Sequence, residues 1–289
     1  MTLTVVFALA AAFSNAVNVF TQHWASVGAP KREKGWRLIP YLFRQPLWLF
    51  GWVAAVGGFA FQAVALNFGE LSVVQPILVT ELVFVLVLRR VWIRQDVAGA
   101  AWAAVLVVCV ALAVFLTMAE PMGGRAAPET AEWLSALVVF GVAIALLTVL
   151  GTRGSPVRRT AAFAVAAALA WALMATFIKT ATGTLASSGL GGLLTSWPVY
   201  ALAAAAVTGT LLEQTALHVG PLSVSQPLLV IVNPFASIAL SVWLFDERFT
   251  DSPAKIAVAA LAFAVLAVGV TVLSRAAPQD FTPARPVRP

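Results

Sequence analysis

The stretch ALNFGELSVVQPILV at residues 65–79 returns later in the chain as ALHVGPLSVSQPLLV at residues 216–230. The two segments align without a gap, and 10 of their 15 positions are identical, including Leu-Ser-Val and Gln-Pro. A weaker match joins FALAAAF, which begins at Phe7, to FAVAAAL, which begins at Phe163. The repeat predicts that the chain consists of two related halves.

The chain around this repeat is strongly apolar. Of its 289 residues, 61% are hydrophobic and only 10% are charged, and the mean hydropathy is +0.93. A soluble domain of this size needs more charge to cover its surface. A helix needs roughly 20 apolar residues to cross the hydrocarbon core, and such runs recur here without the alternation of a membrane β-barrel. The sequence therefore predicts an all-α polytopic membrane protein.

Nine membrane-spanning helices are expected, in two groups of four with the fifth helix between them. The expected helices are residues 2–22, 46–68, 72–90, 97–118, 131–151, 159–182, 193–217, 222–245 and 253–274. The divisions are a first repeat (1–118, with a basic cytosolic segment at 28–45), a linker with the extra helix (119–158), a second repeat (159–274) and a disordered cytosolic tail (275–289). Equivalent helices are five apart, so the two repeats are expected to cross the membrane in opposite directions.

The charged residues divide between alternate connections of this arrangement. The odd-numbered connections and the tail hold 14 Lys and Arg residues with three acids, whereas the even-numbered ones hold three cations with seven acids. Cytoplasmic loops are rich in Lys and Arg, so the basic side is predicted to be cytosolic. The N-terminus is then outside and the C-terminus inside a plasma membrane, expected to be a bacterial inner membrane. The net charge of +6 is explained without a nucleic-acid partner.

Polar side chains form stripes on several of the expected helices. On the helix at 222–245 they fall within about 80° of arc, and on the helix at 2–22 within about 120°. Polar groups in hydrocarbon are costly, so we expect the stripes to line a cavity that binds a substrate or an ion, with the apolar helices at 97–118, 131–151 and 253–274 outside it. The alternative is that the stripes only join helices by hydrogen bonds. The candidates on them are Asn15, Asn18, Glu213, Gln214, Gln226 and Asn233.

Glu81 is the sharpest single candidate. It lies about nine residues, or about 13 Å, from either end of the helix at 72–90. A carboxylate there costs about 2.5–3.5 kcal/mol on insertion scales, so a role in binding a proton, a cation or the substrate is predicted. A hydrogen-bonded structural glutamate is the alternative. Lys179 is expected to extend outward from the outer end of its helix, unless it holds an anionic substrate.

Prolines predict breaks in two of the helices. The pairs Gln75-Pro76 and Gln226-Pro227 occupy matching places in the two halves, and Pro234 follows two turns after the second pair. A proline removes a backbone donor and leaves the carbonyl four residues earlier without its partner. Broken helices at matching places of inverted repeats are typical of binding sites in transporters, and ordinary kinks are the alternative.

The sequence also resembles a known family. The stretch NPFASIALSVWLFDERFTDSPAKIAVAALAFAVLAVGV at 233–270 resembles the end of an EamA-type repeat of the drug/metabolite transporter (DMT) superfamily. The shared features are the early Pro234, the acidic-basic pair Glu247-Arg248 and a closing helix that ends in Gly-Val. The first half, from Trp48 to its Gln-Pro pair, is also similar to the NIPA-like magnesium transporters.

Two departures limit what this resemblance implies. Family members commonly have ten helices, whereas residues 28–45 stand here in place of the second helix of the first half. The first half carries Arg89-Arg90 instead of the acidic cap, and the first helix lacks the glutamate that couples protons in the small multidrug relatives.

Together these features predict a secondary-active transporter of a small organic solute or metabolite, an exporter that works by alternating access. The alternatives are a magnesium or other divalent-cation transporter, a lipid or polyprenyl-carrier translocase, and a non-transporting membrane scaffold. No catalytic constellation or phosphate-binding loop is visible, so neither an enzyme nor a cofactor is expected. The expected partners are the solute or ion and membrane lipids, and a homodimer stays open.

Overall fold

The computed structural model describes residues 1–27, 44–92, 94, 96–121, 123–125 and 128–276. These residues form helices and connections and contain no β-strand. The helices are α1 (Thr2–Val27), α3 (Pro46–Phe68), α4 (Leu71–Leu78), α5 (Glu81–Trp92), α6 (Gly99–Ala119), α7 (Thr130–Gly151), α8 (Pro156–Thr195), α9 (Trp197–Val219), α10 (Leu222–Phe245) and α11 (Pro253–Ala276). Most of the basic segment expected at 28–45 and of the tail expected at 275–289 lies outside the described residues.

The described helices are those of a multi-pass membrane protein. Eight segments are long and apolar enough to cross a membrane, when α4 and α5 are taken as one segment. The remaining helix, α9, has a similar length of 23 residues but is less apolar, because it carries Glu213 and His218. The structure thus gives eight to nine long helices, and nine crossings stay a prediction.

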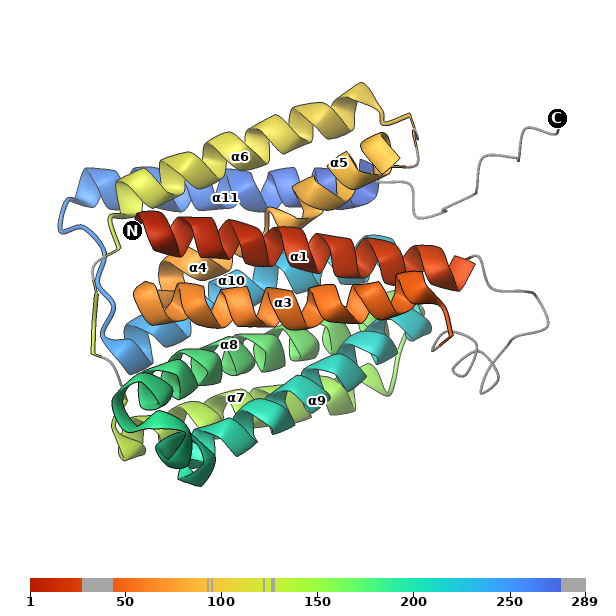
Figure 1. Cartoon of the computed structure of the whole chain (residues 1–289). Coiled ribbons are helices and arrows are strands. Elements are labelled where there is room, and N and C mark those ends of the chain that lie inside the picture. The colour runs from red at the N-terminus through yellow and green to blue at the C-terminus, as the bar shows by residue number, and fades with distance from the viewer. Residues whose placement is uncertain (28–43, 93, 95, 122, 126–127, 277–289) are drawn as a thin grey trace, which may run out of the picture.

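The helices lie side by side in one bundle and alternate in direction (Figure 1). Helix α1 packs most extensively against α3, α8 packs most extensively against α9, and α6 packs against α11. In the view of Figure 1, α1 begins at the left end of the bundle and α8 begins at the right end. Helices that the sequence repeat makes equivalent therefore run in opposite directions. We name the end where α1 begins the N-end, and the end where α8 begins the opposite end.

The expected helix at 72–90 is broken in the middle. Val79 and Thr80 donate their backbone N–H groups to carbonyls only three residues earlier, at 3.2 and 3.0 Å, and Glu81 starts α5. The matching break expected in the second half is absent, because α10 stays helical across Pro227 and Pro234. Both prolines lie inside α10, so each removes one backbone hydrogen bond without ending the helix.

Helix α8 is longer than the sequence predicted. Its helical residues continue past the expected end at 182 to Thr195, with one non-helical residue at Gly189. Gly189 has φ 66° and ψ −170°, a backbone conformation that glycine adopts without the strain a side chain would add. The outer connection expected at 183–192 is therefore helical.

The largest packed core lies toward the N-end of the bundle. It joins α4, the middle of α8 and the C-terminal half of α10, where Ile77, Phe177 and Leu240 are almost fully buried. Trp133 of α7 stacks on Phe177 with ring centroids 4.8 Å apart. Side chains from both halves thus interlock at this end.

Shortening Leu244 should test whether this core holds the bundle together. Leu244 is 0% exposed, whereas Leu211 on α9 is 63% exposed on the outer surface. Leu244→Ala leaves a cavity that costs about 2–5 kcal/mol, so the melting temperature in detergent should fall by several degrees. The same substitution at Leu211 should leave it within about a degree. Equal effects of the two substitutions, measured by thermal unfolding of the purified protein, would contradict this assignment of the core.

Candidate functional site

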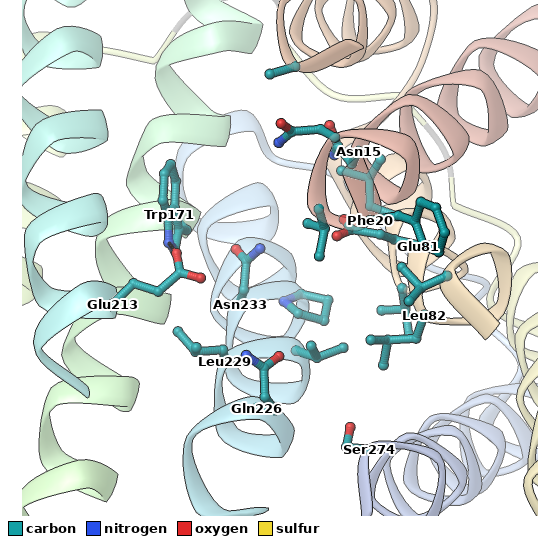
Figure 2. Close-up of a pocket in the computed structure, with 18 of the residues that line it drawn as sticks. Asn15, Phe20, Glu81, Leu82, Trp171, Glu213, Gln226, Leu229, Asn233 and Ser274 are labelled. Carbon is teal, nitrogen blue, oxygen red and sulfur yellow. Dashed lines mark hydrogen bonds between the residues drawn. The ribbon is translucent and has the colours of Figure 1, made fainter. Parts of the chain in front are cut away.

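A cavity of about 960 Å³ lies within the bundle (Figure 2). Its walls come from both halves of the chain, because α1, α3, α4 and α5 contribute residues, as do α8, α9, α10 and α11. Among the described residues, neither α6 nor α7 contributes one, as expected for outer helices. The third helix expected outside, α11, contributes Ser274 at its end, which corrects that expectation.

Most of the candidate residues line this cavity. The nine that do are Asn15, Asn18, Gln75, Glu81, Glu213, Gln214, Gln226, Asn233 and Pro234. The three that do not are Pro76, Pro227 and Lys179. The stripes predicted on separate helices therefore converge on one space. Their binding role stays a prediction.

Two carboxyl groups face the cavity from opposite halves. Figure 2 shows Glu81 on one side, Glu213 on the other and Asn233 between them in this view. Glu213 accepts a hydrogen bond from the indole Nε1 of Trp171 at 3.0 Å. Glu81 is hydrogen-bonded to the Asn15 side chain and lies close enough to Glu213 for the two carboxyl groups to interact electrostatically. Bringing two acids together in an apolar bundle is costly unless a proton or a cation accompanies them.

The break before Glu81 positions its carboxyl group. Because α4 ends at Leu78, Glu81 is the first residue of a new helix and is not the middle of a continuous one. A helix N-terminus carries partial positive charge, which favours a nearby carboxylate. The backbone break and the amide of Asn15 thus supply polar surroundings at a depth where lipid alone would supply none.

Carboxamides are the commonest polar groups of the cavity wall. The eight of them are Asn15, Asn18, Gln22, Gln62, Gln75, Gln214, Gln226 and Asn233. Gln75 is only 2% exposed, and its Nε2 has no hydrogen-bond partner among the described residues. A buried donor left unpaired costs about 1–3 kcal/mol, so a rearrangement of the wall that gave this amide a partner would stabilise the protein.

Sequence reasoning missed several residues of the wall. Arg89 was counted among the cytosolic cations, but it is 5% exposed and lines the cavity, whereas its neighbour Arg90 is about half exposed and pairs with Asp96 at 3.0 Å. Gln62 and Trp171 were missed because each is a single polar group in an apolar run. The one available signal for Arg89 was its place next to Arg90. Neighbouring positions of a helix point about 100° apart, so two adjacent arginines differ in their surroundings.

Lys179 lies away from the cavity, in an ion pair near the N-end. Its Nζ contacts Glu247 Oε1 at 2.5 Å and lies 4.9 Å from the ring centre of Phe245. Its side chain is 13% exposed and that of Glu247 is 0% exposed. The expectation that Lys179 extends outward was therefore wrong, because a buried carboxylate draws it inward.

Among the described residues, no group of three or more His, Cys, Asp and Glu side chains could hold a metal ion. The cavity offers two carboxyl groups, which lie on opposite sides of it in Figure 2. A divalent cation held there would depend on amide oxygens and water for most of its coordination.

Comparison with known proteins gives one informative relative and no function. No protein-family model matches the chain, and no solved structure matches it. An uncharacterized protein of Corynebacterium glutamicum is 28% identical over 277 residues, which cover 94% of this chain and 95% of that protein. The chain is therefore similar over almost its full length to a protein that is itself uncharacterized.

Cysteine labelling should locate the cavity on α10. In a Cys109→Ala background, which removes the exposed natural thiol, Gln226→Cys places a thiol in the cavity wall, and Ser225→Cys places one at a fully buried neighbour. A small thiol reagent should modify position 226 at least about tenfold faster than position 225, because only a solvated thiolate reacts. The rates are measured by mass spectrometry on protein in detergent, and equal rates would contradict the cavity's position.

Proposed function

We propose that this protein is a secondary transporter that moves a small polar organic solute by alternating access. The observation that carries the proposal is the cavity between the two halves, in which Glu81 of one half and Glu213 of the other face a common space. Inverted repeats around a site deep in the membrane are a common plan of secondary transporters.

The position of the cavity supports one of the two states that alternating access requires. Its wall reaches residues close to the opposite end of the bundle, such as Gln22, Leu217 and Ser274. Toward the N-end, packed side chains of α4, α8 and α10 close the bundle instead. The opposite end carries the basic connections, so the proposed state faces the cytosol of a bacterial plasma membrane, with the N-terminus outside.

The chemistry of the wall favours an organic solute. A volume of about 960 Å³ is in the range of small-molecule sites. Carboxamides both donate and accept hydrogen bonds, Arg89 can hold an anionic group, and Phe20, Phe59 and Leu82 offer apolar surface. A carrier for a bare divalent cation would need more carboxylates than the described residues provide.

Glu81 is the proposed coupling residue. A carboxyl group that exchanges a proton or a cation with the solute ties the transport of one to the gradient of the other. Glu213 lies across the cavity from Glu81 and accepts a hydrogen bond from Trp171, and it is the proposed second site for the same proton or cation.

Glu81→Gln should therefore abolish or uncouple transport. The protein is reconstituted in liposomes that contain either a magnesium-sensitive dye or a pH-sensitive dye, and flux is followed as candidate metabolites are added. The matched control is Glu129→Gln, because Glu129 is 77% exposed at the N-end. We expect Glu81→Gln to reduce solute-coupled proton flux at least about tenfold and the control to leave it unchanged. Full transport with an unchanged pH dependence would contradict the role of Glu81, and magnesium entry that Glu81→Gln stops would replace the organic solute by a divalent cation.

Arg89 and Arg90 form a second matched pair. If the solute carries an anionic group that Arg89 holds, Arg89→Gln removes a charge-assisted hydrogen bond of about 1.5–3 kcal/mol. The KM for such a solute should rise at least about tenfold, and KM for an uncharged analogue should change less. Arg90→Gln, next to it on the exposed side, should leave the ratio of the two KM values unchanged, because Arg90 does not line the cavity. An Arg89→Gln protein with the parent KM for anionic solutes would exclude this contact.

A further inference from the structure

The Glu247 carboxylate connects three parts of the chain that are far apart in sequence. It accepts hydrogen bonds from the backbone N–H groups of Leu71 and Ser72 at 2.8 and 3.0 Å, and from the Ser72 hydroxyl at 2.6 Å. It also accepts one from Lys179 at 2.5 Å. Leu71 and Ser72 begin α4, so the carboxylate caps this helix from the connection between α10 and α11.

This contact joins the two halves at the closed end of the bundle. Ser72 belongs to the first repeat, and Lys179 and Glu247 belong to the second. Burial alone would raise the pKa of the Glu247 carboxyl group, but the charge of Lys179 and the hydrogen bonds from Lys179 and Ser72 together lower the pKa below its usual value. The Glu247 carboxyl group therefore stays ionised at neutral pH, and the stability that it contributes is lost only as the pH falls below the usual carboxyl range.

The repeat places an equivalent set of groups at the opposite end. In the ungapped register of the repeat, Leu71 and Ser72 match Leu222 and Ser223, which begin α10. The same register continues without a gap and aligns Asp96 with Glu247, which corrects the expectation that the first half has Arg89-Arg90 in place of this acid. The identities that support it beyond the quoted segments are Phe84 with Phe235, Val91 with Val242 and Trp92 with Trp243.

The two sets differ in this structure. Ser72 and Glu247 are both buried, whereas Ser223 is exposed and the side chain of Asp96 is 100% exposed. Asp96, in the connection after α5, pairs instead with Arg90 near the end of α5 at 3.0 Å. The capping residue of α10 is Pro221, whose side chain offers no hydrogen bond to the helix. At the N-end the carboxylate is thus bound to the start of α4, whereas at the opposite end Asp96 and the start of α10 are not in contact.

We propose that these two sets are the alternating gates of the protein: Glu247 on the start of α4 closes the N-end in the state seen here, and Asp96 on the start of α10 closes the opposite end in the other state. The inference rests on the proposed function, since it gives alternating access its two contacts. Each gate is a carboxylate on a helix N-terminus, which carries partial positive charge. Exchanging one such contact for its equivalent lets the two states differ little in free energy, as a rocking carrier requires.

Lys179 makes the N-end gate the stronger of the two. A carboxylate without solvent exposure is stable only with a charged partner and complete hydrogen bonding, and Glu247 has both. The described partner of Asp96 is Arg90, which lies on the surface of the bundle and is itself half exposed. The resting protein is therefore expected to favour the state closed at the N-end.

A buried reporter tests the gates without any solute. Val73 on α4 is 2% exposed, so in a Cys109→Ala background Val73→Cys should be protected from a polar maleimide in nanodiscs. Glu247→Gln should raise its labelling rate several-fold, because the N-end gate then opens. The matched control is Glu120→Gln, which removes an exposed ion pair with Lys255 at the same end and should leave the rate unchanged.

A second experiment uses a cross-link to close the proposed gate at the opposite end. Asp96→Cys and Ser223→Cys replace exposed residues, so folding is not at stake, and a short bifunctional thiol reagent should link the two positions. In the same protein the link should increase labelling of Val73→Cys from the N-end, whereas Asp96→Cys or Ser223→Cys alone should not. Failure of the pair to link, or a link that leaves Val73→Cys protected, would overturn the proposal. A protein that moves no tested solute but shows this reciprocal exposure would retain the gates and lose the proposed function.

Discussion

The structure depends on one buried negative charge, the Glu247 carboxylate. It lies where a broken helix begins, and it provides acceptors for the two backbone N–H groups that start α4. A helix end buried without such partners is unstable, as is a carboxylate without a counter-charge. Lys179 and the start of α4 satisfy both requirements at once. The same contact lies where α4 packs against α1 and α10, at the closed end of the bundle.

The closed end and the cavity depend on each other. The apolar groups of α4, α8 and α10 fill the space next to Glu247, and the polar groups begin where this packing ends. Ile77 is almost fully buried in that core, while Gln75 on the same short helix is part of the cavity wall. The break after Leu78 then directs Glu81 into the same space. The short helix α4 can therefore pack in the closed end of the bundle with some residues and line the cavity with others.

The chemistry of the cavity supports the proposed organic solute over a divalent cation. Two acids, one arginine and many carboxamides can match a solute that has several hydrogen-bonding groups, but they give few ligands for a bare metal ion. The similarity to an uncharacterized protein of Corynebacterium glutamicum extends over nearly the whole chain, so it concerns the bundle as a unit and not one fragment of it.

The sequence by itself determined that the chain is helical and crosses a membrane, because composition and the length of apolar runs leave few alternatives. It also indicated the residues that line the cavity, since a polar residue in an apolar helix is costly wherever it lies, and Asn15, Glu81 and Asn233 stand out for that reason alone. Only the tertiary structure decided which of these residues share a space and which do not. The sequence-based interpretation named Lys179 as a candidate for the cavity and placed Arg89 in a cytosolic connection, whereas Arg89 lines the cavity and Lys179 does not. The direction of a long cationic side chain near a helix end depends on partners from other helices. For Lys179 that partner, Glu247, is 68 residues away, and no local pattern encodes such a contact.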